Sequence, residues 1–130
     1  MNKICTSLEQ SKKLIELGID VTTADMYYMN GTKHVLVIPN YETDFFNLQE
    51  DDVPAWSLSA LLELIPPYLG ELGDGIDFNF AKTINSKWYA AQYIQIDNSG
   101  LATFPKTVIG DTSVDAAFKM VVWLKENNKI

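Results

Sequence analysis

The sequence predicts an α+β fold in which three helices pack against an antiparallel sheet. Three observations favour this class: apolar stripes at helical spacing in three segments, strand-forming runs in about five others, and turn residues between neighbouring runs. The expected order of elements is α-β-β-α-β-β-β-α. Short connections and hairpins favour one antiparallel sheet of about five strands, with the helices mainly on one of its faces.

Each expected helix has a recognisable start. Thr6 begins the first, because a threonine followed by glutamate three residues later forms a capping box, and Gly18 suits the left-handed residue that ends it. The second helix is expected over residues 57–65, where apolar residues recur at i, i+3, i+4 and i+7 before a pair of prolines. The third begins near Thr112, with Asp115 favourably placed at its positive end.

Strands are expected where β-branched and aromatic residues gather. Asn30-Gly31 is the strongest hairpin signal, because both central residues of a type I′ turn need positive φ. A second turn is expected at residues 97–100, and Pro105 indicates either an edge strand or a bulge. The acidic segment 41–52 is predicted to be a long loop. The expected strands cover residues 26–29, 34–38, 76–80, 87–96 and 101–109.

Length and composition favour one domain, residues 1–130. A hydrophobic content of 47% supplies a core for a chain of this size. The single cysteine, Cys5, excludes an internal disulfide framework and favours a reducing compartment. The polar start does not resemble a secretory signal, and no apolar run approaches the roughly 20 residues of a membrane helix. We therefore expect a cytoplasmic protein that does not enter membranes.

The charge of the chain is unevenly distributed. Seventeen acidic residues against ten basic ones give a net charge of −7, and all ten basic residues are lysines. Because arginine is the usual side chain for phosphate capture and guanine readout, direct nucleic-acid binding is not expected. Between Lys33 and Lys82 the charged residues are all acidic: Glu42, Asp44, Glu50, Asp51, Asp52, Glu63, Glu71, Asp74 and Asp77. This segment is either an ordinary solvated surface or one acidic face that attracts a basic partner.

The sequence contains no recognisable catalytic, cofactor-binding or metal-binding motif. One cysteine and one histidine cannot build a typical zinc site of four ligands. Cys5 precedes a helix whose dipole would lower the thiol pKa, and His34 is the only histidine available as its base. Nothing in the sequence brings these two residues together. We expect no enzymatic activity and no cofactor, and a small cysteine-dependent enzyme stays open as an alternative.

Aromatic residues are the better candidates for a binding site. Trp56 follows the acidic pair Asp51-Asp52, and Tyr28 and Trp88 each adjoin a tyrosine that points to the opposite face of its strand. Exposed aromatic side chains are typical of protein interfaces, although tryptophan and tyrosine also fill cores. The expected interface consists of Trp56, Tyr28, Trp88, Asp51 and Asp52.

Several segments taken together resemble a known group of proteins. They are CTSLEQSKKL at residues 5–14, TADM at 23–26, PAWSL at 54–58 and DAAFKMVVWL at 115–124. In these segments the chain resembles a family of small uncharacterised proteins encoded by phages and mobile elements of gut bacteria. The resemblance covers most of the length at the helices and is loose in the middle. It implies an origin in a phage or an integrated element, and it supplies no activity.

Three functional hypotheses follow. The missing catalytic groups, the aromatic surplus and the uneven charge favour a non-enzymatic accessory protein that binds another protein or itself. The alternative is an acidic decoy that occupies a nucleic-acid site, with the acidic residues between 42 and 77 in place of phosphates. The third hypothesis is a small hydrolase or transferase built on Cys5 and His34.

Overall fold

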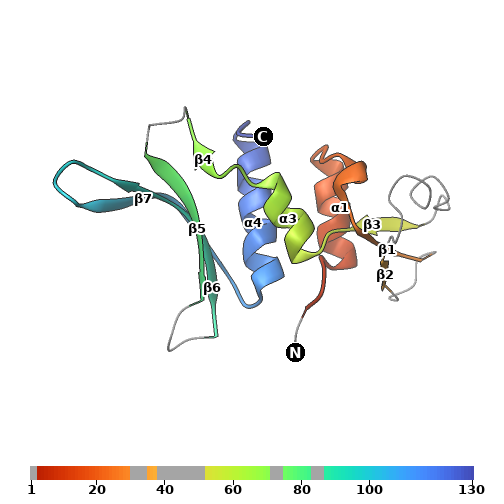
Figure 1. Cartoon of the computed structure of the whole chain (residues 1–130). Coiled ribbons are helices and arrows are strands. Elements are labelled where there is room, and N and C mark those ends of the chain that lie inside the picture. The colour runs from red at the N-terminus through yellow and green to blue at the C-terminus, as the bar shows by residue number, and fades with distance from the viewer. Residues whose placement is uncertain (1–2, 30–34, 38–51, 71–74, 83–86) are drawn as a thin grey trace.

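A computed structural model describes residues 3–29, 35–37, 52–70, 75–82 and 87–130. It confirms the α+β class, with the helices lying between two antiparallel sheets (Figure 1). The helices in the described residues are α1 (Leu8–Glu16), the short 3-10 helix η1 (Val21–Thr23), α3 (Leu58–Leu64) and α4 (Ser113–Glu126). The strands are β1 (Met26–Tyr28), β2 (Val35–Val37), β3 (Val53–Ala55), β4 (Tyr68–Leu69), β5 (Ile76–Lys82), β6 (Tyr89–Ile96) and β7 (Ala102–Gly110).

The strands form two sheets, whereas the sequence predicted a single one. The small sheet has the order β2-β1-β3 and the large sheet the order β4-β5-β6-β7. Two short strands, β3 and β4, were not predicted. Pro54 lies in β3, which is an edge strand, so its missing N–H does not remove a bond from the centre of the sheet. Strand β4 has only two residues and directly follows a pair of prolines.

Helix α1 begins one residue later than predicted. Ser7 is the N-cap: its Oγ accepts a hydrogen bond from the Gln10 N–H at 3.1 Å, and Gln10 Oε1 accepts one from the Ser7 N–H at 2.9 Å. Thr6 is fully buried and its hydroxyl bonds to groups outside this cap, which is why it does not fill the N-cap position. Gly18, with φ of 87°, ends the helix as predicted.

The other two helices begin where the sequence predicts. Ser57 caps α3 by accepting a hydrogen bond from the Ala60 N–H, and Thr112 caps α4 by accepting one from the Asp115 N–H. Helix α4 is buried on two sides, because the large sheet packs on one and α3 on the other. Its buried side chains therefore exceed a single stripe: Val114, Ala116, Ala117, Met120, Val121 and Leu124.

The predicted antiparallel pairing of β1 with β2 is present. Its register differs from the register that a two-residue turn would give. Tyr28 pairs with Val35, whereas a two-residue turn at Asn30-Gly31 would pair Tyr28 with Lys33. The turn itself, at residues 30–34, lies outside the described residues, as does most of the segment 41–52 that was predicted to be a loop.

The β6–β7 hairpin confirms both expectations for Pro105. Strand β7 is an edge of the large sheet. Two of its residues, Phe104 and Pro105, oppose the single β6 residue Ile94, and this bulge interrupts the ladder. A proline at a bulge on an edge strand has no ladder hydrogen bond to lose there.

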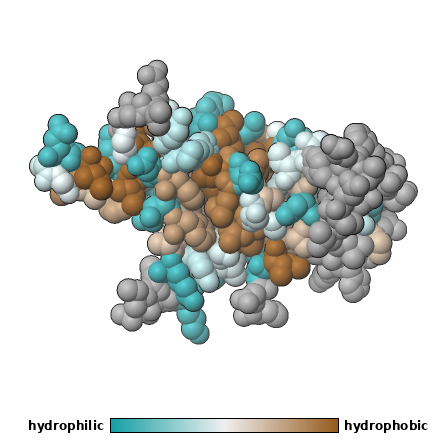
Figure 2. Space-filling view, in the orientation of Figure 1, coloured by the Kyte–Doolittle hydropathy of each residue, from teal (hydrophilic) through white to brown (hydrophobic). Residues whose placement is uncertain are grey.

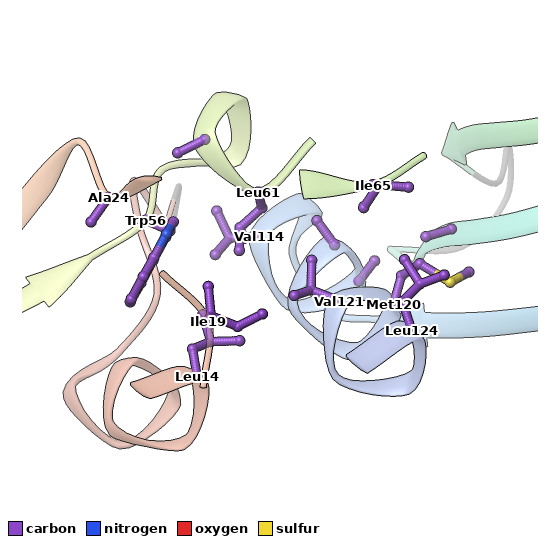
Figure 3. Packing of buried hydrophobic residues seen from close by; sticks show 14 of the residues in the cluster. Leu14, Ile19, Ala24, Trp56, Leu61, Ile65, Val114, Met120, Val121 and Leu124 are labelled. Atoms are coloured by element: carbon purple, nitrogen blue, oxygen red, sulfur yellow. The ribbon is translucent and has the colours of Figure 1, made fainter. Parts of the chain in front are cut away.

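One hydrophobic core connects the two halves of the chain. Figure 3 shows it running from Leu14 on α1 past Trp56 and Leu61 to Val121 on α4. Tyr93 on β6 is also fully buried and joins it from the large sheet. A smaller cluster underlies the small sheet and contains Cys5, Met26, Tyr28 and Ala55. None of the helices in the described residues is long and apolar enough to cross a membrane.

Candidate interaction surface

Two of the predicted interface residues belong to the core. Trp56 is fully buried, and its Nε1 donates a hydrogen bond to Thr23 Oγ1 at 2.9 Å. Tyr28 is 8% exposed, and its hydroxyl donates to the Thr6 carbonyl at 2.7 Å. Because the polar tip of each side chain is satisfied inside the protein, neither needs water. The prediction that these two side chains face a partner is therefore corrected.

The remaining predicted residues are spread over the molecule. Trp88 is 52% exposed and stands directly before β6, at the large sheet. Asp52 is half-buried and directly precedes β3, in the small sheet, rather than a helix. Asp51 lies outside the described residues. Trp88 and Asp52 thus belong to opposite ends of the structure (Figure 1).

The described acidic residues between positions 42 and 77 stand at three separate elements. Of its nine acidic residues, the described part of the chain includes Asp52, Glu63 and Asp77, which stand before β3, on α3 and on β5. The other six lie outside that part. A single acidic face therefore stays a prediction.

Cys5 lies in an environment that opposes nucleophilic activation. It is 3% exposed, and its Sγ lies 3.8 Å from Tyr28 Oη. Burial is the main cause that raises the pKa of the Cys5 thiol above its ordinary value. The position of Cys5 before a helix was expected to lower that pKa, so this expectation is corrected. His34 lies outside the described residues. Within the described ranges, no three His, Cys, Asp or Glu side chains are grouped closely enough to hold a metal ion.

Three of the four segments on which the expected resemblance rests, 5–14, 23–26 and 54–58, meet in a buried hydrogen-bond network. The Trp56 N–H donates to Thr6 Oγ1 at 3.1 Å, the Thr6 N–H donates to the Trp56 carbonyl at 2.9 Å, and the hydroxyls of Thr6 and Ser11 lie 2.8 Å apart. Beside them, the Ser57 N–H donates to Asp25 Oδ1 at 2.9 Å. These residues join the start of α1 to the β3–α3 segment, so their role is structural.

The large sheet has one face that no described helix or strand covers. Side chains of a strand alternate between faces, and Phe78, Phe80, Ala91, Tyr93 and Val108 belong to the core under α4. The intervening residues point away from the helices, toward the side of the sheet that is open in Figure 1. This outer face consists of Asp77, Asn79, Ala81, Ala90, Gln92, Ile94, Thr107 and Ile109.

The outer face is almost free of charge. Asp77, near the start of β5, is the single charged residue among its eight members, in a chain of which 21% is charged. A row of polar groups crosses its centre: Gln92 Nε2 donates to Asn79 Oδ1 and Thr107 Oγ1 donates to Gln92 Oε1, both at 3.4 Å. Aliphatic side chains occupy most of the rest. Depletion of charge is typical of the centre of a protein interface.

The β6–β7 hairpin continues beyond the sheet as an exposed arm, residues 96–105. All ten residues of the arm are exposed, and Figure 1 shows it leaving the sheet on the side away from α4. Three large apolar side chains lie on it: Ile96 is 64% exposed, Leu101 63% and Phe104 52%. Figure 2 shows hydrophobic side chains gathered on this arm, at the left of the view.

The tip of the arm is held by its own hydrogen bonds. Asp97 Oδ1 accepts from the Ser99 N–H at 2.9 Å, from Ser99 Oγ at 2.6 Å and from the Leu101 N–H at 3.0 Å. Gly100, with φ of 86°, supplies the left-handed residue of the turn. An arm ordered before contact loses little conformational entropy when it binds.

A hollow lies where the arm meets the outer face. It has a volume of about 360 Å³ and is lined by Gly75, Asp77, Phe78, Asn79, Ile94 and Ile96. Of the nine exposed large hydrophobic side chains in the described residues, five lie between positions 88 and 109: Trp88, Ile96, Leu101, Phe104 and Ile109. We call the outer face and the arm together the interaction surface.

The free edge of β7 is poorly suited to pairing with another strand. The Ile109 carbonyl accepts a hydrogen bond from Lys119 Nζ at 2.7 Å, Pro105 has no N–H to donate, and the bulge bends the strand. Addition of a further strand at this edge is therefore not favoured.

Comparisons of the chain with protein-family models, curated proteins and solved structures found no match.

Sequence reasoning named one residue of this region, Trp88, and did not identify Gln92, the arm or Ile109. A signal for the outer face was nevertheless present. The run Trp88–Ile96 is apolar on both sides of the strand, with Tyr89, Ala91 and Tyr93 alternating with Ala90, Ile94 and Ile96. A strand with apolar side chains on both sides usually belongs to a sheet that is covered on both faces. The described helices cover one face of the large sheet.

Proposed function

We propose that the protein is a non-enzymatic interaction module that binds another polypeptide chain through the interaction surface. The observation that carries this proposal is the coincidence of a nearly uncharged sheet face with an exposed, apolar and internally ordered arm. Large exposed apolar areas on a soluble protein usually mark contact sites. The arm supplies apolar anchors, and the outer face supplies an area with one charged residue, Asp77, beside them.

Several features agree with binding rather than catalysis. The thiol of Cys5 is buried and its pKa is raised, which does not favour nucleophilic attack. The buried polar groups of Thr6, Ser11 and Trp56 bond to one another and hold the fold together. The resemblance to small phage and mobile-element proteins fits an accessory role of this kind, in the cytoplasm of a bacterial host, without direct nucleic-acid binding.

The test is capture of a partner by two matched surface variants. One double variant, Leu101→Lys with Phe104→Lys, adds two charges to the arm. The control, Ile4→Lys with Ile15→Lys, makes the same change at two exposed apolar positions outside the interaction surface, 62% and 37% exposed. Immobilised wild type, arm variant and control are incubated with bacterial lysate and with purified wild-type chain, and bound proteins are quantified by mass spectrometry.

The expected result is that wild type and control retain the same polypeptide and that the arm variant retains at least ten-fold less of it. This direction follows because burying two lysine charges at an apolar contact is strongly unfavourable. Equal retention by the arm variant and wild type would contradict the proposal, as would the absence of any polypeptide retained above background, including the chain itself.

A further inference from the structure

We infer that the occupant of the outer face is a second copy of this chain, packed face to face about a two-fold axis. The inference rests on the proposed function and adds the identity of the partner. Figure 1 shows the outer face on the side of the large sheet opposite α4, and the arm extends toward that same side. The contact would stack the two large sheets with their outer faces together.

The chemistry of the outer face is self-complementary. In a two-fold dimer a group on the axis meets its own copy, so a charged residue there would face a like charge, whereas a group off the axis meets a different residue of the partner. The central row contains Asn79, Gln92 and Thr107, whose amide and hydroxyl groups both donate and accept hydrogen bonds. With this row along the axis, each of these side chains can bond to its own copy. Ala90 and Ile94, on either side of Gln92 along β6, are both aliphatic and would face each other.

The net charge of the chain also favours the outer face as the contact between two copies. Two chains of net charge −7 repel each other, and the repulsion is smallest where the contact itself carries little charge. Asp77, the one charged member of the outer face, stands near the start of β5, two residues before Asn79 of the central row. A basic partner would gain nothing from this surface, whereas a second copy meets a neutral centre.

The outer face supplies part of the area that a dimer needs. The three strands β5, β6 and β7, about 4.8 Å apart and about 26 Å long, give a face of roughly 370 Å² per copy, or about 740 Å² for the pair. A specific interface buries at least roughly 1,000 Å², so contacts of the two arms must supply the rest. We therefore expect a dimer that half-dissociates at roughly 1–100 µM.

Gln92 offers a decisive test, because it lies in the central strand β6 and in the middle of the polar row. Gln92→Glu places two carboxylates close together in the dimer, and Gln92→Lys places two ammonium groups there. Ser59→Glu and Ser59→Lys are matched controls at an exposed position on α3. Each protein, and an equimolar mixture of the two Gln92 variants, is measured by sedimentation velocity from about 1 to 300 µM at physiological salt.

We expect the wild type and both Ser59 variants to approach twice the monomer mass of 14.6 kDa with rising concentration. Each Gln92 variant alone should dimerise at least ten-fold more weakly, and the mixture should recover the dimer, which also shows that both variants are folded. A monomeric wild type, unaffected Gln92 variants or a mixture that stays monomeric would each overturn the inference. If the wild type is monomeric while lysate capture still depends on the arm, only the identity of the partner is refuted and the proposed function stands.

Discussion

The Lys3 ammonium group lies 2.7 Å from the Asp115 carboxylate, so residues 112 positions apart in the sequence form an ion pair. Gln10 Nε2 donates to the same carboxylate oxygen at 2.8 Å. The pair ties the first described residue to the first turn of α4, next to the N-cap of α1. Helix α4 in turn packs against the large sheet, on the face opposite the outer face.

The first prediction concerns Asp115 and acid. Burial alone would raise its pKa, but hydrogen bonds from Lys3, Gln10 and Thr112 and the charge of Lys3 lower it below the ordinary value. A lowered folded-state pKa gives stability that is present above the unfolded value of about 3.9 and is lost as the pH falls through the folded value. Asp115→Asn should therefore cost about 1–2 kcal/mol at pH 7 and reduce the loss of stability in acid.

Urea unfolding followed by circular dichroism between pH 7 and pH 3 measures both effects. The control is Glu126→Gln, the same change of charge at the other end of α4, which should stay within about 0.5 kcal/mol of wild type. A wild-type-like pH profile for Asp115→Asn would show that the network contributes nothing.

The second prediction separates the two tryptophans that the sequence treats alike. Trp56→Phe removes the hydrogen bond to Thr23 and leaves a cavity in the core, so it should lower the free energy of unfolding by about 2–4 kcal/mol. Trp88→Phe, at a half-exposed site, should change it by less than about 0.5 kcal/mol. Chemical denaturation of both variants tests this, and similar losses for the two would contradict the burial described for Trp56.

The third prediction concerns Gly110, where β7 turns into α4. A Cβ on Gly110 would lie 2.4 Å from the Ala116 backbone nitrogen and 2.8 Å from the Asp115 carbonyl carbon. Gly110→Ala should therefore destabilise the protein by at least about 2–3 kcal/mol. A Cβ added at Gly100 would have no atom within 4 Å. Gly100→Ala should therefore cost only the energy of placing a side chain at positive φ, about 1–2 kcal/mol. Thermal unfolding should rank the two in this order, and the reverse order would refute the close approach of β7 to α4.

The fourth prediction concerns the Cys5 thiol. Because it is buried and its pKa is raised, a disulfide reagent such as Ellman's reagent should label it at least 100-fold more slowly in the native protein than in denaturant at pH 8. Rapid native labelling would instead support the alternative of a reactive cysteine. The reaction is followed by absorbance, with the unfolded chain as its internal reference.

Local signals were sufficient to predict the three α-helices, whereas the short 3-10 helix η1 was not predicted. Serine or threonine at the N-cap, apolar spacing over residues 57–65 and the prolines after it act within a few positions, so α3 and α4 begin where the sequence predicts. The start of α1 was predicted one residue early because both Thr6 and Ser7 have a suitable partner three residues later. The choice between them depends on Trp56, fifty positions away, which occupies the Thr6 hydroxyl.

Long-range contacts account for what the sequence did not predict. The small sheet depends on the pairing of β1 with β3, a three-residue strand that contains Pro54 and was not predicted. Contacts with residues distant in the sequence also decide whether an aromatic side chain is exposed. Elements η1 and α1 enclose Trp56, whereas Trp88 stands directly before β6. The segments on which the expected resemblance rests include Thr6, Ser11 and Trp56 of the buried hydrogen-bond network, so the resemblance gave no direction to the interaction surface.

Site-specific photo-crosslinking tests the central claim most directly. A photoreactive amino acid is placed at Gln92 on the outer face, at Leu101 on the arm, or at Ser59 on α3, and each protein is irradiated in living bacteria. We predict covalent products with a second polypeptide, the chain itself or another protein, from positions 92 and 101 and none from position 59. Products from position 59 without products from positions 92 and 101 would contradict it.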